Sequence, residues 1–205
     1  MTGNFRIPCA PPDLPAAAPS GAPAAKAALR RRLAAARSAI DPASKAKWDS
    51  AIGDHLLAWW RAQPVPPAAL AVYWPLRGEA DLSLAYAALV RAGVQLVLPV
   101  VLARDCALGF ADWQPGEAMV NDALGVAVPA QRRMVARPPA LLVPCLGFNA
   151  GRFRLGYGGG FYDRTLALAP RPVTLGIAYA CLAAPFSSAP HDIALDRIIT
   201  ELGCI

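Results

Sequence analysis

Two apolar segments joined by one helix-length segment constrain the fold of this chain more than any other feature of its sequence. "ALAVYW" (residues 69–74) and "VQLVLPVV" (residues 94–101) are compact apolar runs, which is typical of buried strands. Between them lie a polar loop, "PLRGEAD", and a predicted helix, "LSLAYAALVRAG", which ends at Gly93. This strand–loop–helix–strand order predicts a parallel pair of strands with a crossover helix.

The rest of the chain extends this pattern into one domain. Apolar runs predict strands at residues 108–113, 140–148 and 173–180. Helical spacing of apolar residues predicts helices at residues 24–40 and 44–62, and a further helix that starts at residue 161. The dipeptide Asp41-Pro42 is expected to end the first helix. We therefore expect a single three-layer α/β domain over residues 24–205, with a largely parallel central sheet flanked by helices. Residues 1–23 are rich in proline and alanine and are predicted to be a flexible tail.

Composition excludes several classes of protein. Hydrophobic residues make up 56% of the 205 residues and charged residues 17%, which is a globular composition. No apolar run is long enough to predict a transmembrane helix, and the N-terminus does not resemble a secretory signal. The five cysteines are widely spaced without a C-x-x-C motif, and there are two histidines, so a zinc site is not expected. Reduced thiols and a cytoplasmic, monomeric protein are the expectation.

The net charge of +6 fits an anionic small ligand or a nucleic acid. Arg30, Arg31 and Arg32 form the densest basic cluster, and no run of five basic residues occurs. We therefore expect no nucleic-acid partner and no membrane partner.

A glycine-rich stretch, "GFNAGRFRLGYGGGFYDR" (residues 147–164), follows the strand predicted at residues 140–148 and precedes a predicted helix. Strand, glycine-rich loop and helix in this order can cradle a phosphate, because glycines let backbone N–H groups approach an anion. The stretch matches neither the P-loop pattern nor G-x-G-x-x-G. Its alternative interpretation is a turn that permits tight packing. Asp163, just after the glycines, could hold Mg²⁺ or cap the helix.

Three basic residues share one stripe of the first predicted helix. Lys26, Arg30 and Arg37 lie close together at 100° per residue, whereas Arg31 and Arg32 point elsewhere. On its own, such a stripe is most simply interpreted as a solvated charged face.

The sequence resembles one known family in several segments. "RLGYGGGFYDR" (residues 154–164), after the strand "LLVPCLGF", is similar to the signature of the 5-formyltetrahydrofolate cyclo-ligase family, also called methenyltetrahydrofolate synthetases. "KAALRRRLAAAR", "VYWPLRGEADL", "LGFADWQPGEAMVNDALGVAVP" and "HDIALDRIITE" resemble four further family segments, in order and at similar spacing. The resemblance covers residues 26–205.

The resemblance implies an ATP- and Mg²⁺-dependent enzyme. Family members convert 5-formyltetrahydrofolate to 5,10-methenyltetrahydrofolate and release ADP and phosphate. Phosphorylation of the formyl oxygen turns a poor leaving group into a good one, and N10 of the folate then closes the ring. Such an enzyme must neutralise a triphosphate, hold a metal and exclude water from a reactive intermediate.

The resemblance also implies roles for individual residues on the ATP side. Arg154, Tyr162 and Asp163 are expected to be catalytic, and Asp163 and Asp192 to hold Mg²⁺. Without the resemblance, Asp192 would be interpreted only as an acidic residue in a turn. The residues expected to bind ATP are Lys26, Arg30, Arg154, Leu155, Gly156, Tyr157, Gly158, Gly159, Gly160, Phe161 and Tyr162.

On the folate side, a carboxylate can accept from two donors of a pterin ring at once, and aromatic rings can stack on it. The alternative interpretations are that the negative charges of Glu79 and Asp81 only stabilise the N-terminus of the next helix, and that Trp113 and Tyr73 are core residues without a ligand contact. The residues expected to bind the folate are Leu76, Glu79, Asp81, Trp113, Tyr157 and Tyr162.

The sequence departs from the family pattern at three positions. Asn149 stands where several members have aspartate, Val128 where many have an acid, and Phe161 where tyrosine is frequent. The acid missing at Val128 puts in doubt any ligand contact assigned there. The alternative function is a nucleotide- or phosphate-binding member of the same fold that lacks ligase activity.

Overall fold

The structure of the protein is a computed structural model that describes residues 22–205. Residues 1–21, which make up nearly all of the predicted tail, lie outside the described residues. Four α-helices and one 3₁₀ helix are found in the described part: α1 (Ala22–Ser38), α2 (Pro42–Arg61), α3 (Ser83–Arg91), α4 (Phe161–Leu166) and η1 (Ala180–Leu182).

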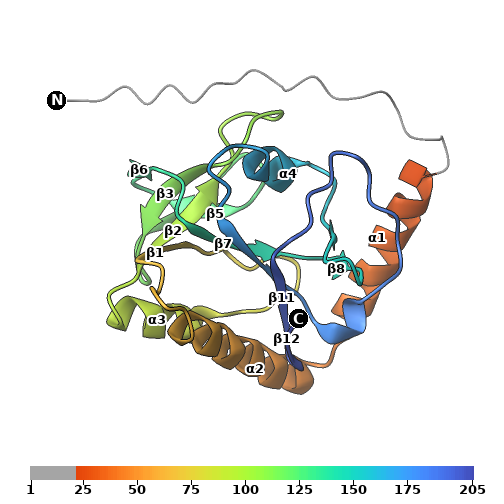
Figure 1. Cartoon of the computed structure of the whole chain (residues 1–205), viewed down its shortest axis with the longest axis horizontal. Helices are drawn as coiled ribbons and strands as arrows, with labels where there is room; N and C mark the ends of the chain where they lie inside the picture. The colour runs from red at the N-terminus through yellow and green to blue at the C-terminus, as the bar shows by residue number, and fades with distance from the viewer. Residues whose placement is uncertain (1–21) are drawn as a thin grey trace.

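An eight-stranded sheet runs through the middle of the domain (Figure 1). Its five central strands are parallel, and the two strands at one edge and the single strand at the other edge join the sheet through antiparallel pairs. The prediction of a largely parallel sheet is thereby confirmed. In spatial order the strands are β12 (Gly203–Cys204), β11 (Arg197–Thr200), β10 (Val173–Ile177), β7 (Ala140–Pro144), β1 (Ala69–Ala71), β2 (Gln95–Val100), β3 (Gly109–Trp113) and β6 (Met134–Val135).

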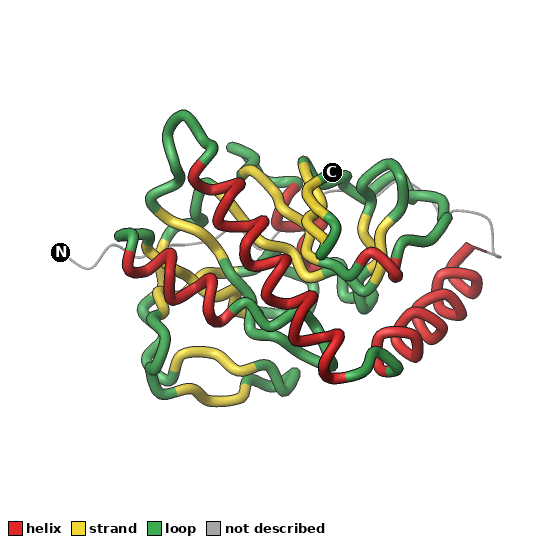
Figure 2. Tube along the Cα trace, turned by 90° about the horizontal axis from the view of Figure 1, so that it is seen from below, coloured by secondary structure: helices red, strands yellow, loops and turns green. Residues whose placement is uncertain are grey.

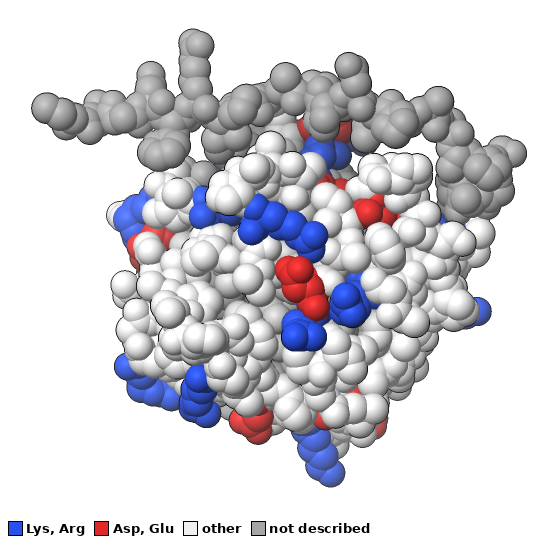
Figure 3. Space-filling view, viewed as in Figure 1, with Lys and Arg blue, Asp and Glu red and all other residues white. Residues whose placement is uncertain are grey.

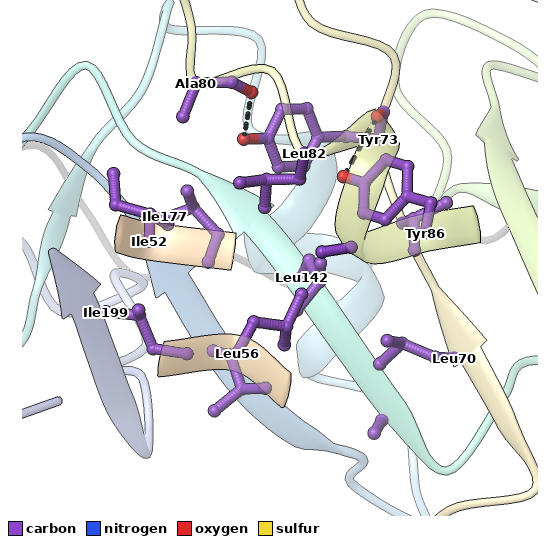
Figure 4. Packing of buried hydrophobic residues seen from close by; sticks show 14 of the residues in the cluster. Ile52, Leu56, Leu70, Tyr73, Ala80, Leu82, Tyr86, Leu142, Ile177 and Ile199 are labelled. Carbon is purple, nitrogen blue, oxygen red and sulfur yellow. Dashed lines mark hydrogen bonds between the residues drawn. The ribbon is translucent and has the colours of Figure 1, made fainter. Parts of the chain in front are cut away.

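Helices cover both faces of this sheet, which makes three layers. Alternating residues of the strands send their side chains to opposite faces, so that Leu142 packs in one apolar cluster and Leu141 in another. The larger cluster joins the sheet to α2 and α3, which cross one face (Figure 2). Ile52 and Leu56 of α2 are fully buried there (Figure 4). The smaller cluster contains Leu166 of α4 on the opposite face.

The junction between α1 and α2 differs in detail from the sequence-based expectation. The predicted break at Asp41-Pro42 is present, but α2 begins at Pro42 and not at Ser44. Asp41 is the N-cap of α2, because its Oδ1 accepts hydrogen bonds from the N–H groups of Ala43 and Ser44 at 3.1 and 2.9 Å. Proline at the first helical position then costs no hydrogen bond.

The segment that follows β3 contains a small hairpin. β4 (Met119–Asn121) pairs with β5 (Ala127–Pro129) in antiparallel register, apart from the main sheet. Asp122 Oδ1 accepts from the N–H groups of Leu124 and Val126 and closes the turn. A second short pair is formed by β8 (Gly147–Phe148) and β9 (Arg154–Leu155).

The chain order places a switch point beside β1. From β1 the chain passes to β2 on one side, and later to β7 on the other. In an open parallel sheet, ligands bind outside the carboxyl ends of the strands at such a point. The loop after β1 and the glycine-rich stretch after β7 both start at this edge.

Among residues 22–205, no helix combines the length and hydropathy that a membrane span requires.

Candidate active site

A cavity of about 860 Å³ opens at this carboxyl edge. Its wall combines residues that follow β1 and β7 with the first turns of α1, the start of α4 and the chain before β11. The cavity brings together all but two of the predicted site residues: Lys26, Arg30, Leu76, Glu79, Arg154, Leu155, Gly156, Tyr157, Gly158, Gly159, Gly160, Phe161, Tyr162, Asp163 and Asp192.

The glycine-rich loop has a backbone that side chains would disturb. Gly158 and Gly160 have φ of +94° and +66°, in the left-handed region that glycine adopts at low cost. A Cβ on Gly159 would lie 2.8 Å from the ring of Phe161. The Nε of Arg30 donates to the carbonyl of Gly156 at 2.8 Å. The basic stripe of α1 therefore holds this loop, in addition to lining the cavity.

Arg154 and Asp163 form an ion pair at the base of the loop. Arg154 Nη2 lies 2.7 Å from Asp163 Oδ1, and the Arg154 side chain is only 6% exposed. Arg154 Nη1 donates to the carbonyl of Ile193, and the N–H of Ile193 donates to Asp163 Oδ1. Because Ile193 directly follows Asp192, these contacts place the two predicted metal-binding acids at the same end of the cavity.

Asp192 is paired with the first basic residue of α1. Lys26 Nζ donates to Asp192 Oδ2 at 2.7 Å, and the N–H of Ala189 donates to the same oxygen. Burial by itself raises the pKa of this carboxyl, but the bonds from Ala189 and Lys26 outweigh it and lower the pKa below the ordinary value. Acidic and basic side chains also lie side by side on the face of the molecule that Figure 3 shows.

The donor set suits a magnesium ion that also binds phosphates. Asp163 and Asp192 offer carboxylate oxygens, the hard ligands that Mg²⁺ prefers. Within the described residues there is no group of three or more His, Cys, Asp or Glu that would form a complete protein cage. Mg²⁺ is usually held by one or two carboxylates together with substrate phosphates and water, and the residues present fit that arrangement.

Glu79 occupies the other side of the cavity and is only 6% exposed. Its Oε2 accepts from the N–H of Leu76, and its Oε1 accepts from the hydroxyl of Tyr157, both at 3.0 Å. Burial raises the pKa of Glu79, and the bond from Leu76, the nearby Arg37 and the bond from Tyr157 limit the rise. A buried carboxylate with one edge held by the protein can accept hydrogen bonds from a ligand with its remaining lone pairs.

Aromatic rings line the wall between the two sides. Tyr157 lies near two guanidinium groups, whose Cζ atoms are 5.8 Å (Arg37) and 5.1 Å (Arg77) from its ring centre. Tyr162 is also in the lining, and burial raises the pKa of its hydroxyl, so it is neutral at physiological pH. Flat apolar walls with few polar groups suit an aromatic ligand.

Two of the predicted folate-binding residues lie outside the cavity lining. Asp81 is exposed, and its Oδ1 accepts from the N–H of Ser83 at the start of α3, which is the alternative arrangement considered for it. Trp113 is 6% exposed in the core, with its ring edge-on to Trp74 and Tyr86. Tyr73 does line the cavity, but it is almost fully buried and donates its hydroxyl to the carbonyl of Ala80 (Figure 4).

Other lining residues escaped the sequence-based prediction. Trp74 and Arg77 follow β1 directly, so their place in the chain was the available signal. Arg77 has φ of +50°, which is uncommon for a residue other than glycine. Asp122, Leu124 and Val126 of the β4–β5 turn also reach the cavity. Only the tertiary fold brings that hairpin there. The segment 187–191 also lines the cavity.

The structure explains two of the three departures from the family pattern. The amide of Asn149 donates to the carbonyl of Phe186, while its Oδ1 accepts from the N–H groups of Gly151 and Phe153; a carboxylate could not donate. Val128 is fully buried against Val100 and Ala111, where a carboxylate would be costly.

The fold and the cavity define an α/β protein with a ligand site at the carboxyl edge of a parallel sheet. One side of this site has cations, glycines and two carboxylates, and the other is apolar with one buried carboxylate. Comparison with known proteins identifies the family. The family model described as the 5-formyltetrahydrofolate cyclo-ligase family matches residues 22–201, and the chain belongs to this family.

Individual relatives agree with this assignment. A protein of Mycoplasma pneumoniae named 5-formyltetrahydrofolate cyclo-ligase is 28% identical over 178 residues, which cover 86% of this chain and 98% of the relative. An Escherichia coli protein of the same name is 30% identical over 152 residues, covering 68% of this chain and 84% of the relative.

Solved structures lead to the same family. The 5,10-methenyltetrahydrofolate synthetase of Mycoplasma pneumoniae superimposes with a TM-score of 0.70 at 27% identity, covering 86% of this chain and 98% of that one. The Aquifex aeolicus 5,10-methenyltetrahydrofolate synthetase, at 22% identity and a TM-score of 0.70, covers 87% of this chain and 91% of that one and has the same fold.

Proposed function

We propose that this protein is an ATP-dependent cyclo-ligase that converts 5-formyltetrahydrofolate to 5,10-methenyltetrahydrofolate and releases ADP and phosphate. One observation carries the proposal besides family membership. A single cavity joins the glycine-rich loop and its carboxylates to the buried carboxylate of Glu79. A phosphate donor and a flat polar ring can therefore meet without leaving the protein.

The proposed reaction has two steps. The formyl oxygen attacks the γ-phosphorus of ATP, and the bond to ADP breaks. N10 of the folate then attacks the formyl carbon and loses its proton, the bond between carbon and the phosphorylated oxygen breaks, and inorganic phosphate leaves. Phosphoryl transfer needs little covalent help from a protein, so positioning and charge neutralisation are the main tasks of the site.

On the phosphate side, Lys26 and Arg30 contact the triphosphate, and the loop from Leu155 to Phe161 wraps the transferred group. Arg154 stabilises the charge that develops on it. Asp163 and Asp192 would hold Mg²⁺, which would supply further neutralisation of the phosphate charge. The proximity of Asp163 and Asp192 supports this assignment.

On the folate side, Glu79 accepts hydrogen bonds from the pterin ring and Leu76 packs against it. Tyr157 and Tyr162 line the junction between the folate and the ATP. Asp81 and Trp113 were predicted to contribute to this side, and their positions favour an indirect role through the start of α3 and the packing of Trp74.

The cavity wall also bears on water exclusion. The reactive intermediate would be lost to hydrolysis in an open site. The β4–β5 turn contributes Leu124 and Val126 to the wall, and these apolar side chains limit the access of water to the reacting carbon.

The protein is further proposed to act as a cytoplasmic monomer. The described residues of one chain supply both sides of the cavity, so the reaction needs no second copy. ATP as co-substrate favours the cytoplasm.

A spectroscopic assay tests the function. Purified protein is mixed with 5-formyltetrahydrofolate, ATP and Mg²⁺, and the near-ultraviolet band of methenyltetrahydrofolate is followed. Growth of the band that needs all three components is expected. If ATP binds but no band grows with any amount of enzyme, the ligase assignment fails and a phosphate-binding protein of the same fold remains.

A further inference from the structure

Arg37 is a buried cation that the proposed chemistry does not use. It stands in the last turn of α1, is 4% exposed, and is not part of the cavity lining. Among the described residues, no carboxylate lies within 4 Å of its guanidinium. Its Nε and Nη1 are buried without a hydrogen-bond partner. A buried arginine that is so poorly paired costs free energy, so a purpose other than stability is indicated.

Among residues 22–205, the guanidinium of Arg37 makes one hydrogen bond, and this bond leads to the folate side of the cavity. Its Nη2 donates to the hydroxyl oxygen of Tyr157. That hydroxyl donates in turn to Oε1 of Glu79 at 3.0 Å. The direction of both bonds is set, because a guanidinium can only donate and an ionised carboxylate can only accept. Arg37, Tyr157 and Glu79 thus form a chain in which a cation acts on a carboxylate through a hydroxyl.

The surroundings of Arg37 favour a role in positioning. Its Cγ lies 4.0 Å from the place where a Cβ of Gly78 would stand, so its stem lies beneath the loop that carries Glu79. Its guanidinium faces the ring of Tyr157 at 5.8 Å. Arg37 therefore touches two cavity segments, the loop after β1 and the glycine-rich loop, from behind.

We propose that Arg37 is a positioning residue for folate recognition, which orients the Tyr157 hydroxyl and keeps the Glu79 carboxylate ionised and aimed into the cavity. This inference rests on the proposed function and deepens it, because it names how the folate side is held. It also gives α1 two tasks: Lys26 and Arg30 serve the phosphate side, while Arg37, on the same stripe of the helix, serves the folate side from behind.

The electrostatic setting of Glu79 agrees with this role. Burial raises the pKa of the neighbouring hydroxyl and thiol groups, so they are neutral near pH 7; they are Tyr73, Tyr86, Tyr157, Tyr162 and Cys145. Arg37 and Arg77 are cations that act on Glu79, and both lower its pKa against the effect of burial. Arg77 is exposed, so solvent screens it more than Arg37.

The test compares Arg37→Met with Arg37→Lys and with Arg31→Met, an exposed arginine of the same helix. Steady-state kinetics give KM separately for 5-formyltetrahydrofolate and for ATP, and thermal unfolding reports stability. For Arg37→Met we expect a rise in the folate KM of roughly tenfold, no change in the ATP KM and no loss of stability, since methionine leaves no buried charge unpaired. Arg37→Lys should restore part of the folate affinity, and Arg31→Met should match the wild type.

Two further readouts separate positioning from a general structural role. In a Tyr157→Phe background, Arg37→Met should add little, because the chain is already broken. A carboxyl NMR titration of Glu79, which does not depend on activity, should show a higher pKa in Arg37→Met than in the wild type.

The inference is overturned if Arg37→Met leaves the folate KM and the Glu79 titration unchanged. It is equally overturned if both KM values and the stability worsen together. A wild-type protein that neither binds nor converts the folate would overturn the proposed function first, and this outcome is visible before any variant is made.

Discussion

The two sides of the cavity hold their charges in different ways. On the phosphate side each carboxylate has a cation of its own, as in the pairs Lys26–Asp192 and Arg154–Asp163, both at 2.7 Å. On the folate side Glu79 has no cation within contact distance and is held by an amide N–H and a hydroxyl. In the proposed reaction, the paired charges would be exchanged for phosphates and a metal when ATP binds. The single buried carboxylate, that of Glu79, would accept hydrogen bonds from the neutral N–H donors of a flat ring.

This difference teaches how one cavity can discriminate two ligands. A paired cation and carboxylate can exchange each other for a phosphate oxygen and a metal ion, so the phosphate side can adapt to a highly charged ligand. A ligand without matching hydrogen-bond donors would leave the buried carboxylate of Glu79 unpaired, which costs free energy. The folate side should therefore be selective for a ligand that carries such donors. Variants of the two sides should therefore differ in which KM they change.

The largest effect is expected for Asp163→Asn on the phosphate side. The change keeps the shape of the side chain but removes the charge that faces Arg154 and the proposed metal. We expect kcat to fall at least about a hundredfold, with an unchanged circular dichroism spectrum. Asp54→Asn, an exposed residue of α2, is the matched control. A folded Asp163→Asn enzyme with normal turnover would contradict the metal role.

Glu79→Gln should break the folate side alone. The amide offers one acceptor oxygen in place of two, and it presents donors toward the donors of the pterin. We expect the KM for 5-formyltetrahydrofolate to rise by roughly 10-fold to 100-fold, while the KM for ATP stays the same. Equal changes in both KM values would show that the two sides are not separate.

A pH series sharpens the same contrast. Because burial raises the pKa of Glu79, its carboxylate is protonated at a higher pH than an ordinary glutamate when the solution is acidified. Folate affinity should be full well above this raised pKa and should fall as the pH drops through it. Binding titrations of the folate without ATP, between about pH 5 and 8, measure this. In Glu79→Gln the same titration should be flat over that range.

Lys26→Met is expected to act on the phosphate side with a smaller effect. It removes one phosphate contact and also releases Asp192 from its ion pair. We expect the KM for ATP to rise roughly threefold to tenfold, with the folate KM unchanged. Lys47→Met, an exposed lysine on α2, should behave as the wild type. A larger change in the folate KM than in the ATP KM would refute the division of the cavity.

The smallest effect on the reaction is expected for Asp81→Ala. Its carboxylate bonds the N–H of Ser83, so its loss should lower the stability by about 1 kcal/mol and Tm by roughly 2–4 °C. The folate KM should not change, as measured beside differential scanning fluorimetry. A raised folate KM would restore the direct folate contact first predicted for Asp81.

The order of the main strands and helices and the glycine-rich loop could be predicted from local patterns, whereas the metal-binding role of Asp192 was implied only by the family resemblance. Apolar runs of strand length and the crossover at residues 69–101 predicted the parallel sheet, and the glycine-rich stretch after β7 marked the loop. The stripe on α1 placed Lys26 and Arg30 on one face, because helix geometry alone decides which residues share a face.

Contacts between distant segments were decided by the tertiary structure alone. Asp81 and Trp113 were predicted for the folate side together with Glu79, yet of these three only Glu79 lines the cavity. Two positions in one loop can face opposite ways, and no local pattern reports which one turns inward. The β4–β5 hairpin reaches the cavity only because the sheet brings it there, and the bond from Arg37 to Tyr157 joins residues 120 positions apart.

The sequence by itself thus determined the family, the fold class and the loop that marks the site. The tertiary structure decided which charges are paired and which carboxylate is buried. The physical reason is that helix, strand and turn preferences act over a few neighbouring residues, whereas burial and ion pairing depend on segments that meet only after the chain has folded.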